Sequence, residues 1–163
     1  MTAIDEMFAA NRAYAAAFKK GSLPMPPARR TAIVACMDAR LDPARALGLE
    51  EGDAHVIRNA GGRVVDALRS LAISQQLLGT AEVAVIHHTD CGMLTFTDDS
   101  IRAKLRENLG ADADHVAFLP FDDVDASVRA DLDAYRSSKL VRQDVPLRGF
   151  VYDVHSGLIR EIA

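Results

Sequence analysis

Short apolar runs alternate with amphipathic helical patterns along most of the chain. Residues 31–35 and 82–87 are uncharged or nearly so and rich in β-branched side chains, which predicts two strands buried on both faces of a sheet. Residues 63–78 carry one apolar stripe at helical spacing, and Gly79 is placed to cap that helix. This alternation of strands and helices predicts an α/β layer fold.

Shorter signals indicate the remaining elements of the body. These are a short helix beginning at Asp42-Pro43, a strand over 54–58, helices over 99–109 and 124–138, and a final pair of strands over 150–154 and 158–162 joined by a Gly-containing hairpin. We expect a three-layer α/β fold with a central, mostly parallel sheet flanked by helices. Its strand order is predicted as 2-1-3-4, with one antiparallel strand at the edge.

The beginning of the chain has a different pattern. Ile4, Met7 and Phe8 recur at helical spacing within residues 3–18, and the Pro-rich stretch 21–30 separates this segment from the body. We therefore predict one domain over 1–163, in which residues 1–26 form a helical arm and residues 27–163 form the α/β body.

Composition and charge narrow the classes of function. The 163 residues are 49% hydrophobic and 26% charged, with a formal net charge of -4. This balance is typical of a globular protein, and the absence of a basic excess argues against general nucleic-acid binding. Asp5 and Glu6 stand where a secretory signal would carry basic residues, and no apolar run is long enough for a membrane span. We expect a cytoplasmic protein with a small-molecule partner and no membrane contact.

The two cysteines, Cys36 and Cys91, are too few for a disulfide scaffold and are typical of a reducing compartment. Either one alone is most simply a small buried hydrophobe. However, Cys36 ends the first predicted strand, and the segment 88–91 ends the third. In a sheet of order 2-1-3-4 these two strands are neighbours and open a crevice at their carboxyl ends, so we expect the two thiols to meet there.

Cys36, His88 and Cys91 together form a candidate zinc site. Two thiolates and one imidazole match Zn²⁺, and three protein ligands leave a fourth tetrahedral position for water, which indicates catalysis. His87 competes with His88 for this role. It still belongs to the strand, where alternation directs it to the opposite face, so His88 is preferred.

Asp38 and Arg40 follow Cys36 in an alternating pattern that places all three side chains on one side of an extended segment. Asp38 is either a fourth metal ligand in a closed site or the partner of Arg40, whose guanidinium can hold a carboxylate away from the metal. A simple surface ion pair is the plainer interpretation of these two residues.

The motifs C-M-D-A-R at 36–40 and H-T-D-C-G at 88–92 resemble the β-class carbonic anhydrase family, and V-I-R-N-A-G at 56–61 is similar to its second-strand segment. The resemblance spans residues 28–160. It implies that a zinc-bound hydroxide hydrates carbon dioxide to bicarbonate and a proton. It further implies one Zn²⁺ per subunit, bound by Cys36, His88 and Cys91, with Asp38 and Arg40 as the catalytic pair and with Asn59, Gly61 and Gly92 as substrate-pocket candidates.

The resemblance also implies a homodimer or a dimer of dimers, in which the N-terminal helix contacts the neighbouring subunit. Four positions depart from the family pattern: Met37 and Ala39 replace serines, Gly62 replaces Asn, and His87 replaces Gly. Three alternatives stay open. They are hydrolysis of carbonyl sulfide or carbon disulfide, a non-catalytic zinc protein, and a thiol-redox protein that uses the two cysteines.

Overall fold

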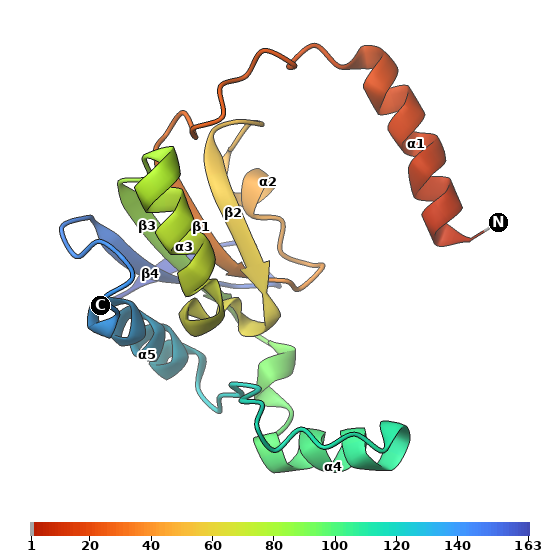
Figure 1. The fold of residues 1–163 in the computed structure, drawn as a ribbon, viewed down its shortest axis with the longest axis vertical. Helices are drawn as coiled ribbons and strands as arrows, with labels where there is room; N and C mark the ends of the chain where they lie inside the picture. Colours follow the sequence, from red (N-terminus) through yellow and green to blue (C-terminus); the bar gives the residue numbers. More distant parts are fainter. Residues whose placement is uncertain (1) are drawn as a thin grey trace.

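The computed structural model describes residues 2–163. Its centre is a five-stranded sheet of order β2-β1-β3-β4-β5 (Figure 1). The first three pairs in this order are parallel, and β4 pairs with β5 in the antiparallel direction. This confirms the predicted α/β class, strand order and antiparallel edge. The strands are β1 (Thr31–Cys36), β2 (Ala54–Asn59), β3 (Glu82–His88), β4 (Leu147–Tyr152) and β5 (Ile159–Ile162).

Helices flank the sheet, and the two long helices of the body pack on the same face. Side chains of α3 and α5 form the main apolar cluster with alternate residues of β1, β3 and β4, among them Val34, Val85 and Val151. The opposite face carries a smaller cluster that includes Ile33 and Ile86, covered in part by the end of α2. The helices are α1 (Ala3–Ala17), α2 (Pro43–Leu47), α3 (Val64–Leu78), α4 (Asp98–Leu109) and α5 (Val124–Ser137), with the 3-10 turns η1 (Ala60–Gly62) and η2 (Gly92–Leu94).

The helix ends follow the local signals in the sequence. The Asp42 carboxylate accepts hydrogen bonds from the first amides of α2, and Pro43 occupies its first position. Gly79 ends α3 in the left-handed conformation with φ +74°, which a residue without a Cβ adopts at little cost. None of the described helices combines the length and the apolarity that crossing a membrane requires.

The last pair of strands differs from the prediction in its bounds. β4 begins three residues earlier than expected, because Leu147 pairs with Val83 of β3. β4 ends at Tyr152, since the Asp153 carboxylate accepts hydrogen bonds from the amides of His155 and Ser156 and turns the chain there. The connection between the strands is therefore a six-residue turn, 153–158, rather than a short hairpin.

The N-terminal segment lies apart from the body. Figure 1 shows α1 at the end of a long linker, and none of its residues is buried. The segment contacts the body near the end of α1 and just after it. Tyr14 of α1 donates a hydrogen bond to Glu51, and Lys20, which follows α1, pairs with Glu50 and Glu51. The apolar stripe predicted over residues 3–18 is thus exposed in the single chain.

Candidate metal centre

Two neighbouring strands bring the predicted metal-binding residues together. Cys36 is the last residue of β1 and His88 the last residue of β3, and these strands are paired. Cys91 follows three residues later, after a tight turn. One side-chain donor atom from each of the three lies within 4.8 Å of the others, and their exposed fractions are 4%, 0% and 3%. The structure thus forms a buried group of three donors.

The orientation of His88 leaves one ring nitrogen free. Its Nδ1 lies 2.8 Å from the carbonyl oxygen of Thr89. Because a carbonyl only accepts, Nδ1 carries the hydrogen and donates it. The Nε2 atom is buried without a hydrogen-bond partner, so its lone pair is available on the side of the thiols. An imidazole fixed in this way by a backbone carbonyl is typical of metal-binding histidines.

The two thiols influence each other directly, because their sulfur atoms are 4.0 Å apart. The hydrogen bond from Cys91, assisted by His88, lowers the pKa of Cys36. The same contact, together with burial, raises the pKa of Cys91. Burial lowers the pKa of His88, but the neighbouring Cys36 thiolate outweighs burial and the net shift of the His88 pKa is upward. Two sulfurs and one imidazole nitrogen are the donor set that Zn²⁺ prefers, so the residues present fit this metal.

Asp38 lies at the rim of this group and is held there by Arg40. The guanidinium donates from Nε to Oδ1 at 3.0 Å and from Nη2 to Oδ2 at 2.8 Å. These bonds lower the pKa of Asp38 well below its usual range. Its Oδ2 is 3.7 Å from Nε2 of His88. The predicted pair therefore exists, as a two-pronged contact beside the donors.

Arg58 of β2 has a part in the site that the sequence did not indicate. Its guanidinium donates to the carbonyl of Cys36 at 3.0 and 2.8 Å and to the carbonyl of Asp38 at 2.7 Å. It therefore holds the backbone that carries one thiol and the carboxylate. Its position in the R-N segment was visible in the sequence, but its hydrogen-bond partners were not.

The three pocket candidates have different surroundings. The amide of Asn59 is used by the backbone of Arg63, to which it donates at 2.8 Å and from which it accepts at 2.7 Å. Gly61 has φ +80°, and a Cβ there would lie 3.0 Å from Met93 Cγ. A Cβ on Gly92 would meet nothing within 4 Å. Of these three candidates, Gly92 borders open space.

Gly62, where the family pattern has Asn, is explained by a close backbone approach. A Cβ at this position would lie 2.8 Å from the backbone nitrogen of Cys36, and the residue has φ +71°. Both the contact and the left-handed conformation favour glycine. The turn η1 is thereby packed directly against the end of β1.

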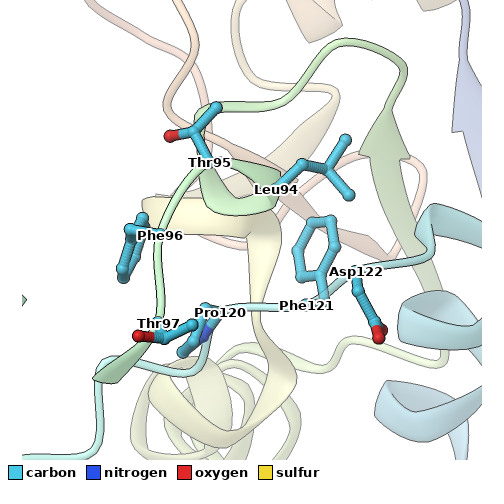
Figure 2. A pocket seen from close by; sticks show the side chains of 7 residues that line it. All are labelled: Leu94, Thr95, Phe96, Thr97, Pro120, Phe121 and Asp122. Carbon is cyan, nitrogen blue, oxygen red and sulfur yellow. The ribbon is translucent and has the colours of Figure 1, made fainter. Parts of the chain in front are cut away.

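A cavity of about 540 Å³ has in its lining two aromatic rings that also pack against the cluster of the thiols. Phe96 and Phe121 pack against the cluster of Cys36, Cys91 and Met93. Figure 2 shows the same two rings on separate sides of the cavity. The lining residues are Leu94, Thr95, Phe96, Thr97, Pro120, Phe121 and Asp122.

His87 points away from the thiols, as strand alternation predicts. Its Nδ1 is 2.6 Å from Ser127 Oγ, its Nε2 is 2.9 Å from Asp131 Oδ2, and its ring stacks on Phe121 with the centroids 5.5 Å apart. Arg63 Nε lies 3.0 Å from the same oxygen of Asp131. Ser127, Asp131, Phe121 and Arg63 thus surround His87 in one cluster, of which His87, Ser127 and Asp131 are buried.

Comparison with known proteins gives consistent matches. The family model described as carbonic anhydrase matches residues 31–159. The β-carbonic anhydrase 1 of Mycobacterium tuberculosis is 50% identical over 165 residues and covers 99% of both chains. The carbon disulfide hydrolase of Acidithiobacillus thiooxidans is 33% identical over 157 residues, with 83% of this chain and 78% of that protein covered.

Solved structures agree in both fold and sequence. The carbonic anhydrase from Streptococcus mutans has a TM-score of 0.95 and 48% identity, covering 100% of this chain and 99% of that chain. The carbonic anhydrase from Glaciozyma antarctica has a TM-score of 0.88 and 52% identity, covering 95% of each chain.

Proposed function

Because the chain belongs to the β-carbonic anhydrase family, we propose that it catalyses the reversible hydration of carbon dioxide to bicarbonate and a proton with one Zn²⁺ per chain. The observation that carries this proposal is the buried group of Cys36, His88 and Cys91, whose donor atoms lie within 4.8 Å of one another. The free Nε2 of His88 supports it, since a buried nitrogen without a partner is costly unless something binds it.

Cys36, His88 and Cys91 would hold the Zn²⁺, which when bound would lower the pKa of a coordinated water and so supply the nucleophile. The protein's own residues supply orientation. We assign Asp38, 3.7 Å from His88 Nε2, to accept a hydrogen bond from the attacking water. Arg40 keeps this carboxylate ionised and fixes its direction. We assign the open space beside Gly92 to the linear substrate.

The charge of the donor set predicts how the rate depends on pH. Two thiolates would cancel the charge of a bound Zn²⁺ and would leave a coordinated water with a higher pKa than three neutral imidazoles would. We therefore expect hydration rates that rise from neutral to alkaline pH. Stopped-flow hydration assays on protein with measured zinc content test this. A rate that does not change over this range contradicts the charge argument.

Hydration activity, zinc content and the oxidation state of the two cysteines separate the remaining interpretations. Zinc-loaded protein without hydration activity at any pH supports a non-catalytic zinc protein, in which Asp38 is the fourth ligand. Protein purified without metal and with a bond between Cys36 and Cys91 supports a thiol-redox function. Either result would overturn the proposed activity.

Hydrolysis of carbon disulfide is a second candidate, because a relative with that name is 33% identical to this chain. The 50% identity to a β-carbonic anhydrase favours carbon dioxide. Turnover of carbon dioxide, carbonyl sulfide and carbon disulfide by one preparation decides between them. We expect carbon dioxide to be the best substrate.

We also propose that the protein is a homodimer or a dimer of dimers, with residues 1–26 as an arm on a single-domain body. Ile4, Met7 and Phe8 of α1 are more than half exposed. On the sheet face opposite α3 and α5, a groove of about 430 Å³ includes Ile33 and Phe150 in its lining. Apolar surfaces of this kind are usually covered by a partner. Free thiols at the metal site further favour a cytoplasmic location.

Removal of residues 1–26 should therefore weaken self-association. We expect analytical ultracentrifugation to show an oligomer for the full chain and a smaller species for the truncated one, because the truncation removes the exposed stripe of α1. A full chain that is monomeric at assay concentrations would contradict the proposed assembly.

A further inference from the structure

Asp90 lies in the turn between His88 and Cys91 and has an unusual backbone conformation. Its φ is +54°, in the left-handed region that Asn, Asp and Gly tolerate best. Its side chain is 64% exposed. On these facts alone Asp90 is a residue that allows a tight turn. Its contacts with Arg40 indicate a second role.

Arg40 is bound from two directions. On one side its Nε and Nη2 donate to the carboxylate of Asp38. On the other side, Nη1 donates to Asp90 Oδ2 at 2.7 Å and Nη2 donates to the Asp90 carbonyl at 2.8 Å. One guanidinium thus joins the segment after β1 to the turn after β3.

The second carboxylate matters because the guanidinium of the pair is exposed. The side chain of Arg40 is 46% exposed, and an isolated ion pair at the surface is weak and loosely ordered. Contacts on both sides restrict the rotation of the guanidinium, which a network of charges achieves better than one pair. The Arg40 backbone amide holds Asp38 Oδ1 at 2.8 Å, but Asp38 Oδ2, which lies 3.7 Å from His88 Nε2, is held by the guanidinium and depends on this order.

We propose that Asp90 is a positioning residue that anchors Arg40 to the His88–Cys91 turn and thereby keeps Asp38 at the rim of the metal site as a hydrogen-bond acceptor. The inference rests on the proposed function, because it assumes a metal at the three donors. Without the anchor, the Arg40 guanidinium releases Asp38 Oδ2, and this oxygen becomes available as a fourth ligand while the backbone amide of Arg40 keeps Oδ1. Asp90 therefore favours the open form of the site.

Two substitutions separate this role from that of turn former. Asp90→Gly keeps the left-handed conformation and removes the side chain. Asp90→Asn keeps the conformation and one acceptor oxygen but removes the charge. Asp99→Asn serves as the control, because Asp99 is an acidic residue of α4 whose side chain is 98% exposed and whose cationic neighbour is Arg102.

The readout is the visible absorption spectrum of the Co²⁺-substituted protein, which reports the ligands of the metal, together with kcat/KM for hydration by the zinc form. We expect Asp90→Gly to bind one metal per chain, to show a changed Co²⁺ spectrum, and to lose about 10- to 100-fold in kcat/KM. Asp90→Asn should lie between this variant and the wild type. In the double variant Asp38→Asn/Asp90→Gly the spectrum should return to that of Asp38→Asn alone, since no carboxylate is left to bind.

An unchanged Co²⁺ spectrum in Asp90→Gly would overturn the proposal. Loss of metal by this variant would also overturn it, because Asp90 would then act through the turn and not through Arg40. A wild-type protein that binds metal but does not hydrate carbon dioxide would contradict the proposed function instead, and the spectra would still test the role of Asp90.

Discussion

His87 and His88 are neighbours in β3 and are both fully buried, but they have opposite surroundings. His88 faces two thiols, and its Nε2 has no hydrogen-bond partner. His87 faces α5, with Ser127 at one ring nitrogen and Asp131 at the other. The first imidazole has a free donor atom and the second has close polar neighbours on both sides.

The comparison shows that neighbouring groups decide what a buried histidine does. Both rings are removed from water, which penalises any polar atom without a partner. At His88 the thiols and a fixed Nδ1 hydrogen make metal binding the way to satisfy Nε2. At His87 the ring lies among polar and charged groups of the protein: Ser127 Oγ is 2.6 Å from Nδ1, and Asp131 Oδ2, which pairs with Arg63, is 2.9 Å from Nε2 without hydrogen-bond geometry. One face of the strand is thus suited to chemistry and the other to stability.

Replacing each histidine in turn should give the largest difference. We expect His88→Ala to lose its zinc and its hydration activity while keeping the far-ultraviolet circular dichroism of the wild type, because the ligand is removed but the sheet is not. We expect His87→Ala to keep one zinc per chain and to unfold more easily. Metal analysis and urea denaturation of both variants measure this. Zinc loss in His87→Ala, with zinc retained in His88→Ala, would reverse our assignment.

The next effect concerns the ion cluster behind His87. Asp131 is fully buried, and the Asp131→Asn substitution leaves the Arg63 guanidinium without its counter-charge. Removing one partner of a buried pair typically costs about 3–5 kcal/mol. Asp133 on the same helix is an exposed partner of Arg136, so Asp133→Asn should change the free energy of unfolding by less than about 0.5 kcal/mol. Equal costs for the two variants in urea denaturation would show that the cluster does not stabilise the fold.

Much of this difference between the two faces could be predicted from the sequence. The apolar runs gave the strands, the strand order brought Cys36 next to the segment 88–91, and alternation separated His87 from His88. These predictions depend on periodicity and topology, which are encoded locally. The pairing of Asp38 with Arg40 was also expected as one of two possibilities, because the residues are two positions apart.

The contacts that the sequence did not indicate join distant segments. Arg58 binds the carbonyl of Cys36, which is 22 positions away, and Arg40 binds Asp90 across 50 positions. Such contacts depend on side-chain rotamers and on the left-handed turn at Asp90, for which a single sequence carries no periodic signal. The partners of His87 on α5 were missed for the same reason, since Ser127 is 40 positions from it.

The smallest expected effect isolates one hydrogen bond at His87. The Ser127 hydroxyl is the hydrogen-bond partner of His87 Nδ1 at 2.6 Å, and its oxygen also lies 2.8 Å from the carbonyl oxygen of Val124. Ser127→Ala leaves Nδ1 of His87 buried without a partner, which costs about 1–3 kcal/mol. Ser137→Ala, at an exposed position of the same helix, controls for the change in helix propensity.

Zinc content decides whether the two faces are independent. If the buried cluster only stabilises the fold, Ser127→Ala lowers the free energy of unfolding but leaves metal content and pH profile unchanged. A shift in the pH dependence of the hydration rate would mean that a change at the His87 ring moves His88 through the backbone they share. The two faces of β3 would then be parts of a single site, and the division between chemistry and stability would fail.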